Sequence, residues 1–166
     1  MNAEDLADRI RERVPDVIVA RGEVTAIVGR DDLLETLAWG REESDVALDF
    51  LSSITATHWP NADPAFWVHY ELRSMPHRHR ARVKVGLRAG DEHVPSVTSL
   101  HPTANWHERE TFDFYGIVFD GHPDLTRILL PDDWDGYPLR KDEPLGGVAT
   151  WFQGATMPPI DERGMA

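Results

Sequence analysis

The chain has 166 residues, no cysteine and a formal net charge of −12 at pH 7, and 41% of its residues are hydrophobic. This length and composition fit one domain with a buried core. An acidic surface repels nucleic acid and anionic lipid, which argues against both as partners. Without thiolates the chain provides no disulfide, no cysteine-ligated zinc site and no ligands for an iron–sulfur cluster.

The sequence shows neither a membrane span nor an export signal. No apolar run approaches the ~20 residues that a transmembrane helix needs. The first residues, MNAEDLADRIRERV, lack the basic and then apolar order of a signal peptide. We therefore expect a cytosolic chain or a water-exposed part of a larger assembly.

The first thirty residues predict a helix followed by a β-hairpin. An apolar residue at every fourth position predicts a helix over residues 3–14, with Asn2 as its cap and Pro15 as its end. Runs of β-branched residues at 17–20 and 23–28 flank an Arg-Gly pair, which is typical of a hairpin turn.

The next sixty residues predict a second helix and three more strands. The helix covers residues 31–38, and we expect Gly40 to end it. Strands are predicted at 50–59, 66–72 and 80–87, the last with a regular alternation of apolar and charged residues.

A third helix is predicted over residues 105–115, with Asn105 as its cap, Glu108 bonded back to that cap and Gly116 as its end. The order α-β-β-α-β-β-β-α indicates an α+β fold. We expect a two-layer domain with a mainly antiparallel sheet, helices on one face and an extended C-terminal tail.

We divide the chain into an α+β core domain at residues 1–119 and a tail at residues 120–166. The tail holds six of the twelve prolines and six of the twelve glycines, a density that prevents long regular elements. It also holds four aromatic residues, Trp134, Tyr137, Trp151 and Phe152. Aromatic residues need an apolar surface, either on the chain's own domain or on a partner. We favour a partner, because Trp and Tyr are typical interface anchors.

The helix at 105–115 carries the first candidate for chemistry, a group of carboxylates formed by Glu108, Glu110 and Asp113 with Arg109 among them. Such a group serves acid–base catalysis or metal binding in some enzymes, and local ion pairing in many helices. Histidines lie nearby at His101, His107 and His122, but their spacing matches no standard zinc motif.

A second candidate is the basic loop at residues 73–82, with four arginines and two histidines in ten residues. One interpretation is a site for an anion. The other is a hairpin tip whose charges keep a sheet edge in water. An isolated basic pair, Arg140 and Lys141, lies in the otherwise acidic tail. No glycine-rich phosphate loop and no exposed-nucleophile motif is present.

Residues 94–144 resemble the 30-kDa subunit family of respiratory complex I, the NADH:quinone oxidoreductase. The matching segments are Glu108-Arg109-Glu110, Asp113, Gly116, His122-Pro123-Asp124-Leu125, Arg127-Ile128-Leu129-Leu130-Pro131 and Pro138-Leu139-Arg140-Lys141-Asp142. One position departs from the family's pattern. Thr126 stands where the family usually has a basic residue, which puts one expected salt bridge in doubt.

The resemblance implies a non-catalytic core subunit of the peripheral arm, at the cytoplasmic side of the cell membrane. It implies the D, B and I subunits of complex I as partners, and no small-molecule ligand on this chain. NADH, FMN, iron–sulfur clusters and quinone would act elsewhere in the assembled complex. The equivalent subunit of a membrane-bound hydrogenase or of a dehydrogenase with another donor is an alternative. An independent enzyme using the carboxylates and a free anion-binding module are two further ones.

The resemblance implies no catalytic, cofactor-binding or metal-binding residue on this chain. It implies roles in folding and in subunit contacts for a set of motif residues: Glu108, Arg109, Glu110, Asp113, Gly116, His122, Pro123, Arg127, Trp134, Tyr137, Arg140, Lys141 and Asp142. We expect Arg127, Arg140 and Lys141 to pair with partner subunits.

Overall fold

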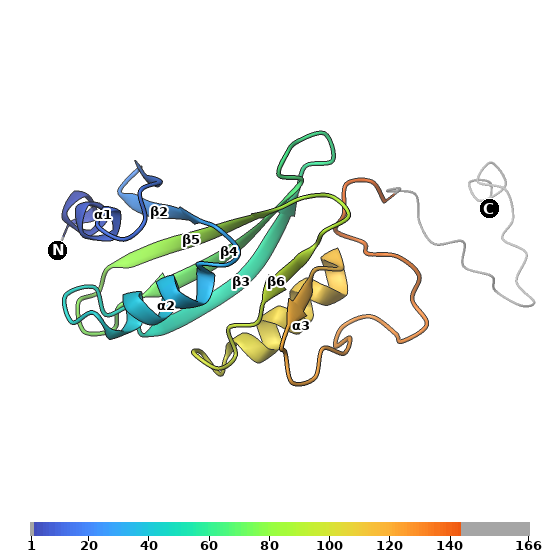
Figure 1. The fold of residues 1–166 in the computed structure, drawn as a ribbon. Helices are drawn as coiled ribbons and strands as arrows, with labels where there is room; N and C mark the ends of the chain where they lie inside the picture. The colour runs from blue at the N-terminus through green and yellow to red at the C-terminus, as the bar shows by residue number, and fades with distance from the viewer. Residues whose placement is uncertain (1, 144–166) are drawn as a thin grey trace, which may run out of the picture.

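The computed structural model of the protein describes residues 2–143 (Figure 1). Its elements, in chain order, are α1 (Ala3–Arg11), β1 (Val17–Ala20), β2 (Glu23–Val28), α2 (Leu33–Glu42), β3 (Phe50–His58), β4 (Phe66–Arg73), β5 (Arg80–Leu87), β6 (His93–Pro95), α3 (Ala104–Tyr115) and β7 (Val118–Asp120). All five strands predicted from the sequence form, each within one residue of its expected ends. Trp151 and Phe152, expected to anchor the tail, lie outside the described residues.

Strands β1 to β5 form one sheet in the order β1-β2-β5-β4-β3. The pairs β1–β2, β5–β4 and β4–β3 are antiparallel, whereas β2 and β5 run parallel. The parallel pair joins the N-terminal hairpin to a strand that follows it by about fifty residues in sequence. The α+β fold with a mainly antiparallel sheet is therefore confirmed.

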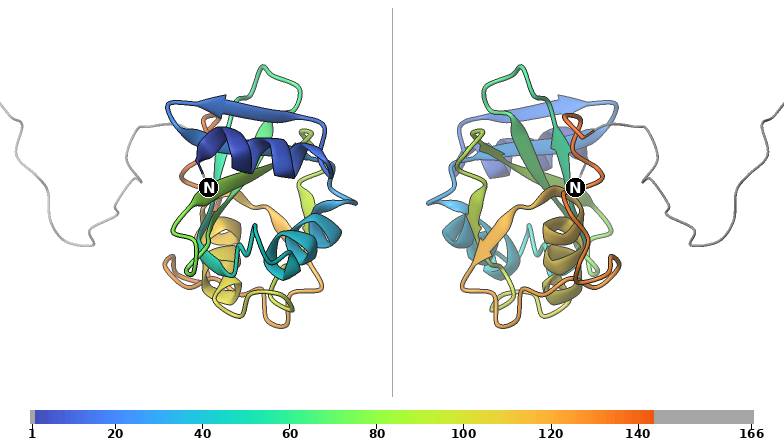
Figure 2. Two further views of the ribbon diagram at one scale, coloured as in Figure 1. Left: turned by 90° about the vertical axis from the view of Figure 1, so that its left-hand side faces the viewer. Right: turned by 90° about the vertical axis from the view of Figure 1, so that its right-hand side faces the viewer.

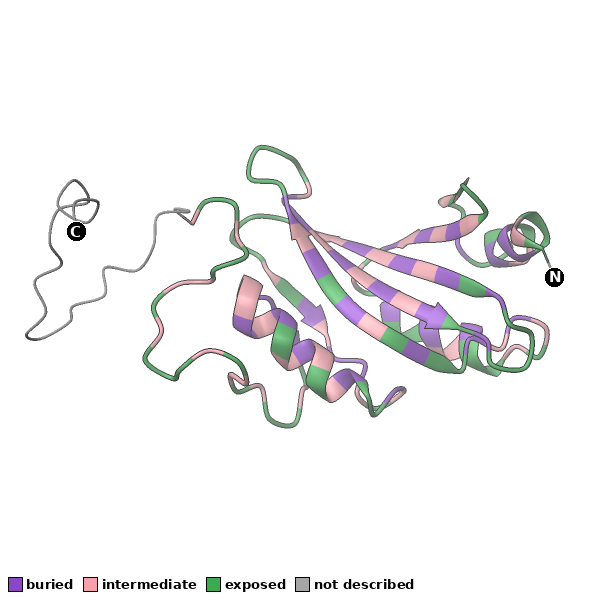
Figure 3. Ribbon diagram, turned by 180° about the vertical axis from the view of Figure 1, so that it is seen from behind, coloured by how far each residue is buried: buried purple, intermediate pink, exposed green. Residues whose placement is uncertain are grey.

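The hydrophobic core lies on one face of this sheet. Every second residue of the central strands is buried, including Tyr70 of β4 and Val83 and Val85 of β5, because successive side chains of a strand point to opposite faces. Ile10 of α1 and Leu37 of α2 lie beside Val83, so both helices cover this face. Figure 2 shows α1 alongside the β1–β2 hairpin. Figure 3 shows the opposite face of the strands with no helix in front of it.

Helix α2 does not end at Gly40, as the sequence pattern predicts, but continues to Glu42. A Cβ atom at position 40 would lie 3.6 Å from Leu48 Cδ1, which is an ordinary van der Waals distance. The packing of Leu48 therefore does not require glycine at this position, and Gly40 does not mark the helix end.

The start of α3 also differs from the prediction. The helix begins at Ala104 with Thr103 as N-cap, and no side chain bonds to the cap. Asn105 therefore lies inside the helix. Glu108 does not return a bond to the cap either, because its side chain is fully buried. The tertiary environment of Glu108 overrides the local capping pattern.

Strands β6 and β7 were not predicted. They form a parallel pair in which Val94 lies opposite Phe119, and both side chains belong to the core. Each strand has three residues, which is too short for a periodic signal in the sequence. Within the described part of the chain, no helix combines the length and the apolar character that crossing a membrane requires.

Helix α3 ends where the sequence predicts, at Gly116, which has a left-handed φ of 73°. Beyond β7 the chain turns back as an extended segment, residues 121–143, which we call the strap (Figure 1). The strap brings the Tyr137 ring onto the end of α3. A Cβ atom at position 116 would lie 2.6 Å from Tyr137 Cε2, so only glycine allows this contact.

We predict that Gly116→Ala destabilises the chain by about 2–4 kcal/mol, because it strains a left-handed residue and displaces the Tyr137 ring. Gly121→Ala is the matched control, since Gly121 also has a positive φ but nothing lies within 4 Å of its Cβ position. It should cost about 1 kcal/mol. Urea unfolding of both variants measures the difference, and equal losses would show that the Tyr137 contact contributes nothing.

Candidate functional site

Asp113 connects α3 to the strap. One of its carboxylate oxygens, Oδ2, accepts hydrogen bonds from the backbone N–H groups of Ile128, Leu129 and Leu130 at 3.1, 2.8 and 3.0 Å. Its other oxygen accepts a bond of 3.0 Å from the Arg127 guanidinium. Burial of Asp113 acts to raise its pKa, but these bonds outweigh burial and hold the pKa below its usual value. The carboxylate stays ionised and fixes four successive residues of the strap.

The guanidinium of Arg127 has its ion-pair and hydrogen-bond partners within the chain. Besides its ion pair with Asp113, it donates to the carbonyl oxygen of Gly136 at 3.3 Å, and its guanidinium lies 5.4 Å from the centre of the Tyr137 ring. Only 15% of its side chain is exposed. Asp113 thus compensates the charge of Arg127 within the chain, and the pairing of Arg127 with a partner subunit stays a prediction.

Arg109 binds Thr126 of the strap. Its guanidinium donates to the Thr126 carbonyl oxygen at 3.0 Å and to the Thr126 hydroxyl at 2.8 Å. The same guanidinium lies 5.2 Å from the centre of the Trp106 ring. Thr126 thus binds Arg109 through hydrogen bonds and not through a salt bridge.

The end of the strap lies across the N-terminal end of β4. The backbone N–H of Lys141 donates to His58 Nδ1 at 3.0 Å, and the Arg140 guanidinium lies 4.9 Å from the centre of the Phe66 ring. Arg140 also pairs with Glu92 at 3.5 Å. Through residue 143 the strap thus lies on its own domain, the less favoured of the two interpretations of the tail.

The other strap residues that the sequence singled out have smaller roles. Asp142 lies 3.7 Å from His58 Nδ1 and 3.4 Å from Arg140 Nε. Trp134 is half-buried, whereas Pro123 and Lys141 are exposed. No carboxylate of the described residues lies within ion-pair distance of the Lys141 ammonium, so its charge is available to a partner.

Glu108 lies on the opposite side of α3 and joins the helix to residues 96–97. Its carboxylate accepts bonds of 2.7 Å from the backbone N–H of Val97 and from the hydroxyl of Ser96. His122 Nε2 lies 3.9 Å away. Burial of Glu108 raises its pKa to about 7, although both hydrogen bonds act in the other direction.

His122 carries its proton on one defined nitrogen. Its Nδ1 accepts a bond from the backbone N–H of Asp124 at 3.0 Å, and its Nε2 lies 3.2 Å from the carbonyl oxygen of Asn105. A carbonyl oxygen accepts, so Nε2 must carry the hydrogen. The ring joins the start of the strap to the start of α3.

The three carboxylates of α3 do not form one site. Glu108 is buried in the core, Asp113 is bonded to the strap, and Glu110 is exposed. At about 100° per residue, Glu108 is turned away from the other two side chains, whereas Glu110 and Asp113 share a face of the helix but differ in burial. Among residues 2–143, no group of three or more His, Asp or Glu side chains is arranged to hold a metal ion.

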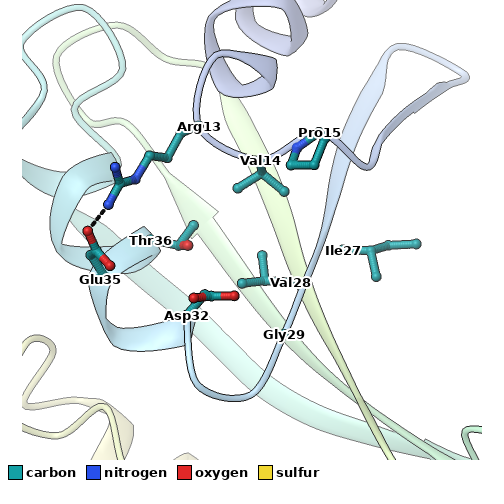
Figure 4. A pocket seen from close by; sticks show the side chains of 9 residues that line it. All are labelled: Arg13, Val14, Pro15, Ile27, Val28, Gly29, Asp32, Glu35 and Thr36. Carbon is teal, nitrogen blue, oxygen red and sulfur yellow. Dashed lines mark hydrogen bonds and ion pairs between the residues drawn. The ribbon is translucent and has the colours of Figure 1, made fainter.

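One hollow lies away from α3, between the end of β2 and the start of α2 (Figure 4). Its volume is about 480 Å³, and Val14 and Val28 are among the residues that line it. Arg13 and Glu35 form an ion pair at its rim, as Figure 4 shows. Asp32 and Thr36 also line it, and the carboxylate of Glu35 is already paired with Arg13.

The basic loop at 73–82 is the turn between β4 and β5, and its side chains have mixed roles. Arg82 pairs with Glu71 and Glu23 across the sheet, on the face without helices. His77 and His79 bond through Nε2 to the carbonyl oxygens of Ser44 and Val46. The remaining three arginines, Arg73, Arg78 and Arg80, line a second hollow of about 350 Å³.

We predict that Asp113→Asn destabilises the chain by about 2–4 kcal/mol, because it removes the charge that holds Arg127 and weakens three bonds to the strap. Since its pKa is depressed in the folded state, the stability from Asp113 is present above its unfolded pKa and lost as the pH falls through the folded one. Thermal unfolding at pH 7 measures the loss. Glu110→Gln is the control and should leave the melting temperature unchanged; similar melting of both variants would contradict the role of Asp113.

The buried carboxyl group of Glu108 leads us to predict a different pH dependence of the stability. Because its pKa is raised to about 7 in the folded state, the folded chain keeps the proton that the unfolded chain releases near pH 4.5. Its contribution to stability is therefore present below pH 4.5 and is lost as the pH rises to about 7. Glu108→Gln resembles the protonated form, with an amide that donates to Ser96.

Relative to the wild type, Glu108→Gln should gain about 1–3 kcal/mol in the free energy of unfolding between pH 5 and pH 7.5. Urea titrations of both proteins at the two pH values measure this change. A constant difference between them would mean that Glu108 does not titrate in this range.

Comparison with known proteins relates these features to a family. The C subunit of NADH-quinone oxidoreductase from Nocardioides sp. is 44% identical to this chain over 168 residues, which cover 97% of this chain and 67% of the relative. The corresponding protein of Saccharopolyspora erythraea is 47% identical over 92% of this chain and 61% of the relative. The chain thus spans about two thirds of the length of these relatives.

Two solved structures are similar. The trypsin-resistant fragment of Nqo5 matches with a TM-score of 0.63 and 31% identity, over 74% of this chain and 98% of the fragment. A chain of the membrane-bound sulfane sulfur reductase, described as an archaeal respiratory membrane complex, matches with a TM-score of 0.73 and 26% identity, over 86% and 85%. The family model for the 30-kDa subunit of respiratory-chain NADH dehydrogenase matches residues 26–149, and the chain belongs to this family.

Proposed function

We propose that the chain is a non-catalytic core subunit of the peripheral arm of a proton-translocating NADH:quinone oxidoreductase, where it braces the quinone-reducing module. Its relatives are named as the C subunit of NADH-quinone oxidoreductase. In this proposal electrons pass from NADH through flavin and iron–sulfur centres to quinone on other subunits. The absence of cysteine and the separation of the three α3 carboxylates support a role without redox or acid–base chemistry.

Within this proposal, the D, B and I subunits of the complex are the partners, and the complex holds the chain at the cytoplasmic side of the membrane. The finer assignment of partners rests on the family resemblance. The net charge of −12 supports basic surfaces on the partners and argues against direct binding to anionic lipid.

The main support for the bracing role is that exposed apolar side chains lie on the strap, whose backbone is hydrogen-bonded to α3. Leu129 is 58% and Leu139 is 45% exposed, although the backbone N–H groups of both are bonded to α3, at Asp113 and at the Phe114 carbonyl oxygen. Trp106 on α3 is 63% exposed. Exposed apolar residues on a backbone that is already ordered favour binding, because little entropy is lost when a partner covers them.

We predict that Leu129→Ser combined with Leu139→Ser lowers the amount of assembled complex while the isolated chain melts as the wild type does. Truncation of one central anchor typically costs ~2 kcal/mol of binding energy. Both side chains are exposed in the free chain, so their loss should change its own stability little. Native gels of gently solubilised membranes, stained for NADH oxidation, measure assembly.

Ile18→Ser is the matched control, because Ile18 is 50% exposed on β1 and lies away from the strap. It should leave assembly unchanged. Normal assembly of the double variant would contradict the strap as a partner-binding surface. Loss of assembly in the control as well would mean that any exposed apolar residue has this effect.

A related complex with another electron donor is a second candidate, supported by the similarity to a chain of the archaeal membrane-bound sulfane sulfur reductase. Co-purification distinguishes the two. If the tagged chain brings flavin- and NADH-binding subunits with it in stoichiometric amounts, NADH is the donor. If other input subunits accompany it, the chain serves a related complex.

A further inference from the structure

The hollow beside the β4–β5 turn has a lining that differs from the rest of this acidic chain. Arg73, Arg78, His79 and Arg80 line it from the turn, and Leu6 of α1 lies opposite. Its volume is about 350 Å³, and no carboxylate is part of its lining. The chain as a whole has 29 acidic and 17 basic residues, so three arginines around one hollow without an acidic side chain are unusual.

The arginines lie close together, and their positive charges repel one another. Arg73 and Arg80 are direct cross-strand neighbours in the β4–β5 pair, where like charges destabilise a sheet. Glu23 compensates Arg80 at 3.1 Å. Among the described residues, no carboxylate lies within ion-pair distance of Arg73 or Arg78. An anion in the hollow would supply the missing negative charge.

The turn holds these side chains on an ordered backbone. The N–H of Ser74 donates to the His79 carbonyl oxygen at 2.9 Å, and the N–H of Arg78 donates to the Ser74 carbonyl oxygen at 2.9 Å. Arg78 itself has a left-handed φ of 59°, which is uncommon for a residue with a side chain. An arrangement that is ordered beforehand binds a ligand with a smaller loss of entropy.

His79 provides an independent observation. Its side chain is 9% exposed, and its Nε2 lies 2.6 Å from the carbonyl oxygen of Val46, so Nε2 carries a hydrogen. Its Nδ1 is buried and has no hydrogen-bond partner. A buried polar atom without a partner costs free energy unless a ligand or a water molecule satisfies it. A protonated His79 ring would add a positive charge beside the hollow.

We propose that this hollow binds a small phosphate-class oxyanion, held by Arg73, Arg78 and the imidazolium of His79. Arginine suits this ligand because its fork of N–H groups matches two phosphate oxygens. The volume exceeds that of inorganic phosphate and admits a phosphorylated small molecule or a lipid headgroup with the same chemistry. The site does not depend on the proposed role in a respiratory complex.

Binding should depend on pH through His79. Burial lowers the pKa of this histidine, and His77, stacked on it with ring centres 5.6 Å apart, lowers it further. The Val46 carbonyl and Asp45 act in the opposite direction, and Arg73, Arg78 and Arg80 face the same hollow. A bound anion favours the imidazolium, so an oxyanion whose charge does not change in this range, such as sulfate, should bind more tightly at pH 6 than at pH 8.

Calorimetric titration of the full chain with inorganic phosphate tests the site directly. We expect saturable binding that raises the melting temperature, and sulfate, whose charge is constant in this range, should bind more tightly at pH 6 than at pH 8. Arg78→Gln should weaken it about tenfold, the equivalent of one lost charge-assisted hydrogen bond. Arg88→Gln is the control, because Arg88 is an exposed arginine that pairs with Asp63 at 3.5 Å and lies outside this hollow.

A second titration uses vesicles of phosphatidylcholine with and without phosphatidic acid. Vesicle binding that Arg78→Gln abolishes would support the site and identify a lipid headgroup as the source of the phosphate. Binding of inorganic phosphate alone would support it with a free or small phosphorylated ligand. No saturable binding of either probe, or equal binding by the Arg78 and Arg88 variants, would overturn the proposal.

Discussion

The bond network of Asp113 is the interaction on which the C-terminal third of the described structure depends. A buried carboxylate is costly unless hydrogen bonds surround it, and here three consecutive backbone N–H groups and one guanidinium do so. The strap therefore has one position relative to α3. Arg127 then lies over Tyr137, and the Tyr137 ring rests on Gly116 at the end of the helix.

Helix α3 joins two other parts of the molecule, residues 96–97 and the strap, through polar side chains on different faces. Glu108 binds residues 96–97, Asp113 binds the strap, and Arg109 binds Thr126. Each of these groups is used in a bond that fixes the chain's own backbone. A cluster that resembles an active site in the sequence thus binds the chain's own backbone in the structure.

The elements that local patterns specify were predictable, and those that depend on distant contacts were not. The hairpin at 17–28 and the strand at 80–87 follow from alternation and from Arg21-Gly22, whose residues both adopt positive φ. Strands β6 and β7 depend on pairing between segments more than twenty residues apart. The tail composition predicted an extended segment, but an aromatic residue such as Tyr137 does not reveal from its sequence whether its own domain or a partner covers it.

The strap and the basic hollow lie at opposite ends of β4. Arg140 of the strap covers Phe66, the first residue of the strand, and Arg73 at the hollow is its last. Seven residue steps of extended chain separate these positions by about 23 Å. The acidic chain thus presents an apolar surface at one end and an uncompensated positive charge at the other. A protein partner on the strap and a small anion in the hollow would not meet, so each can be occupied without excluding the other.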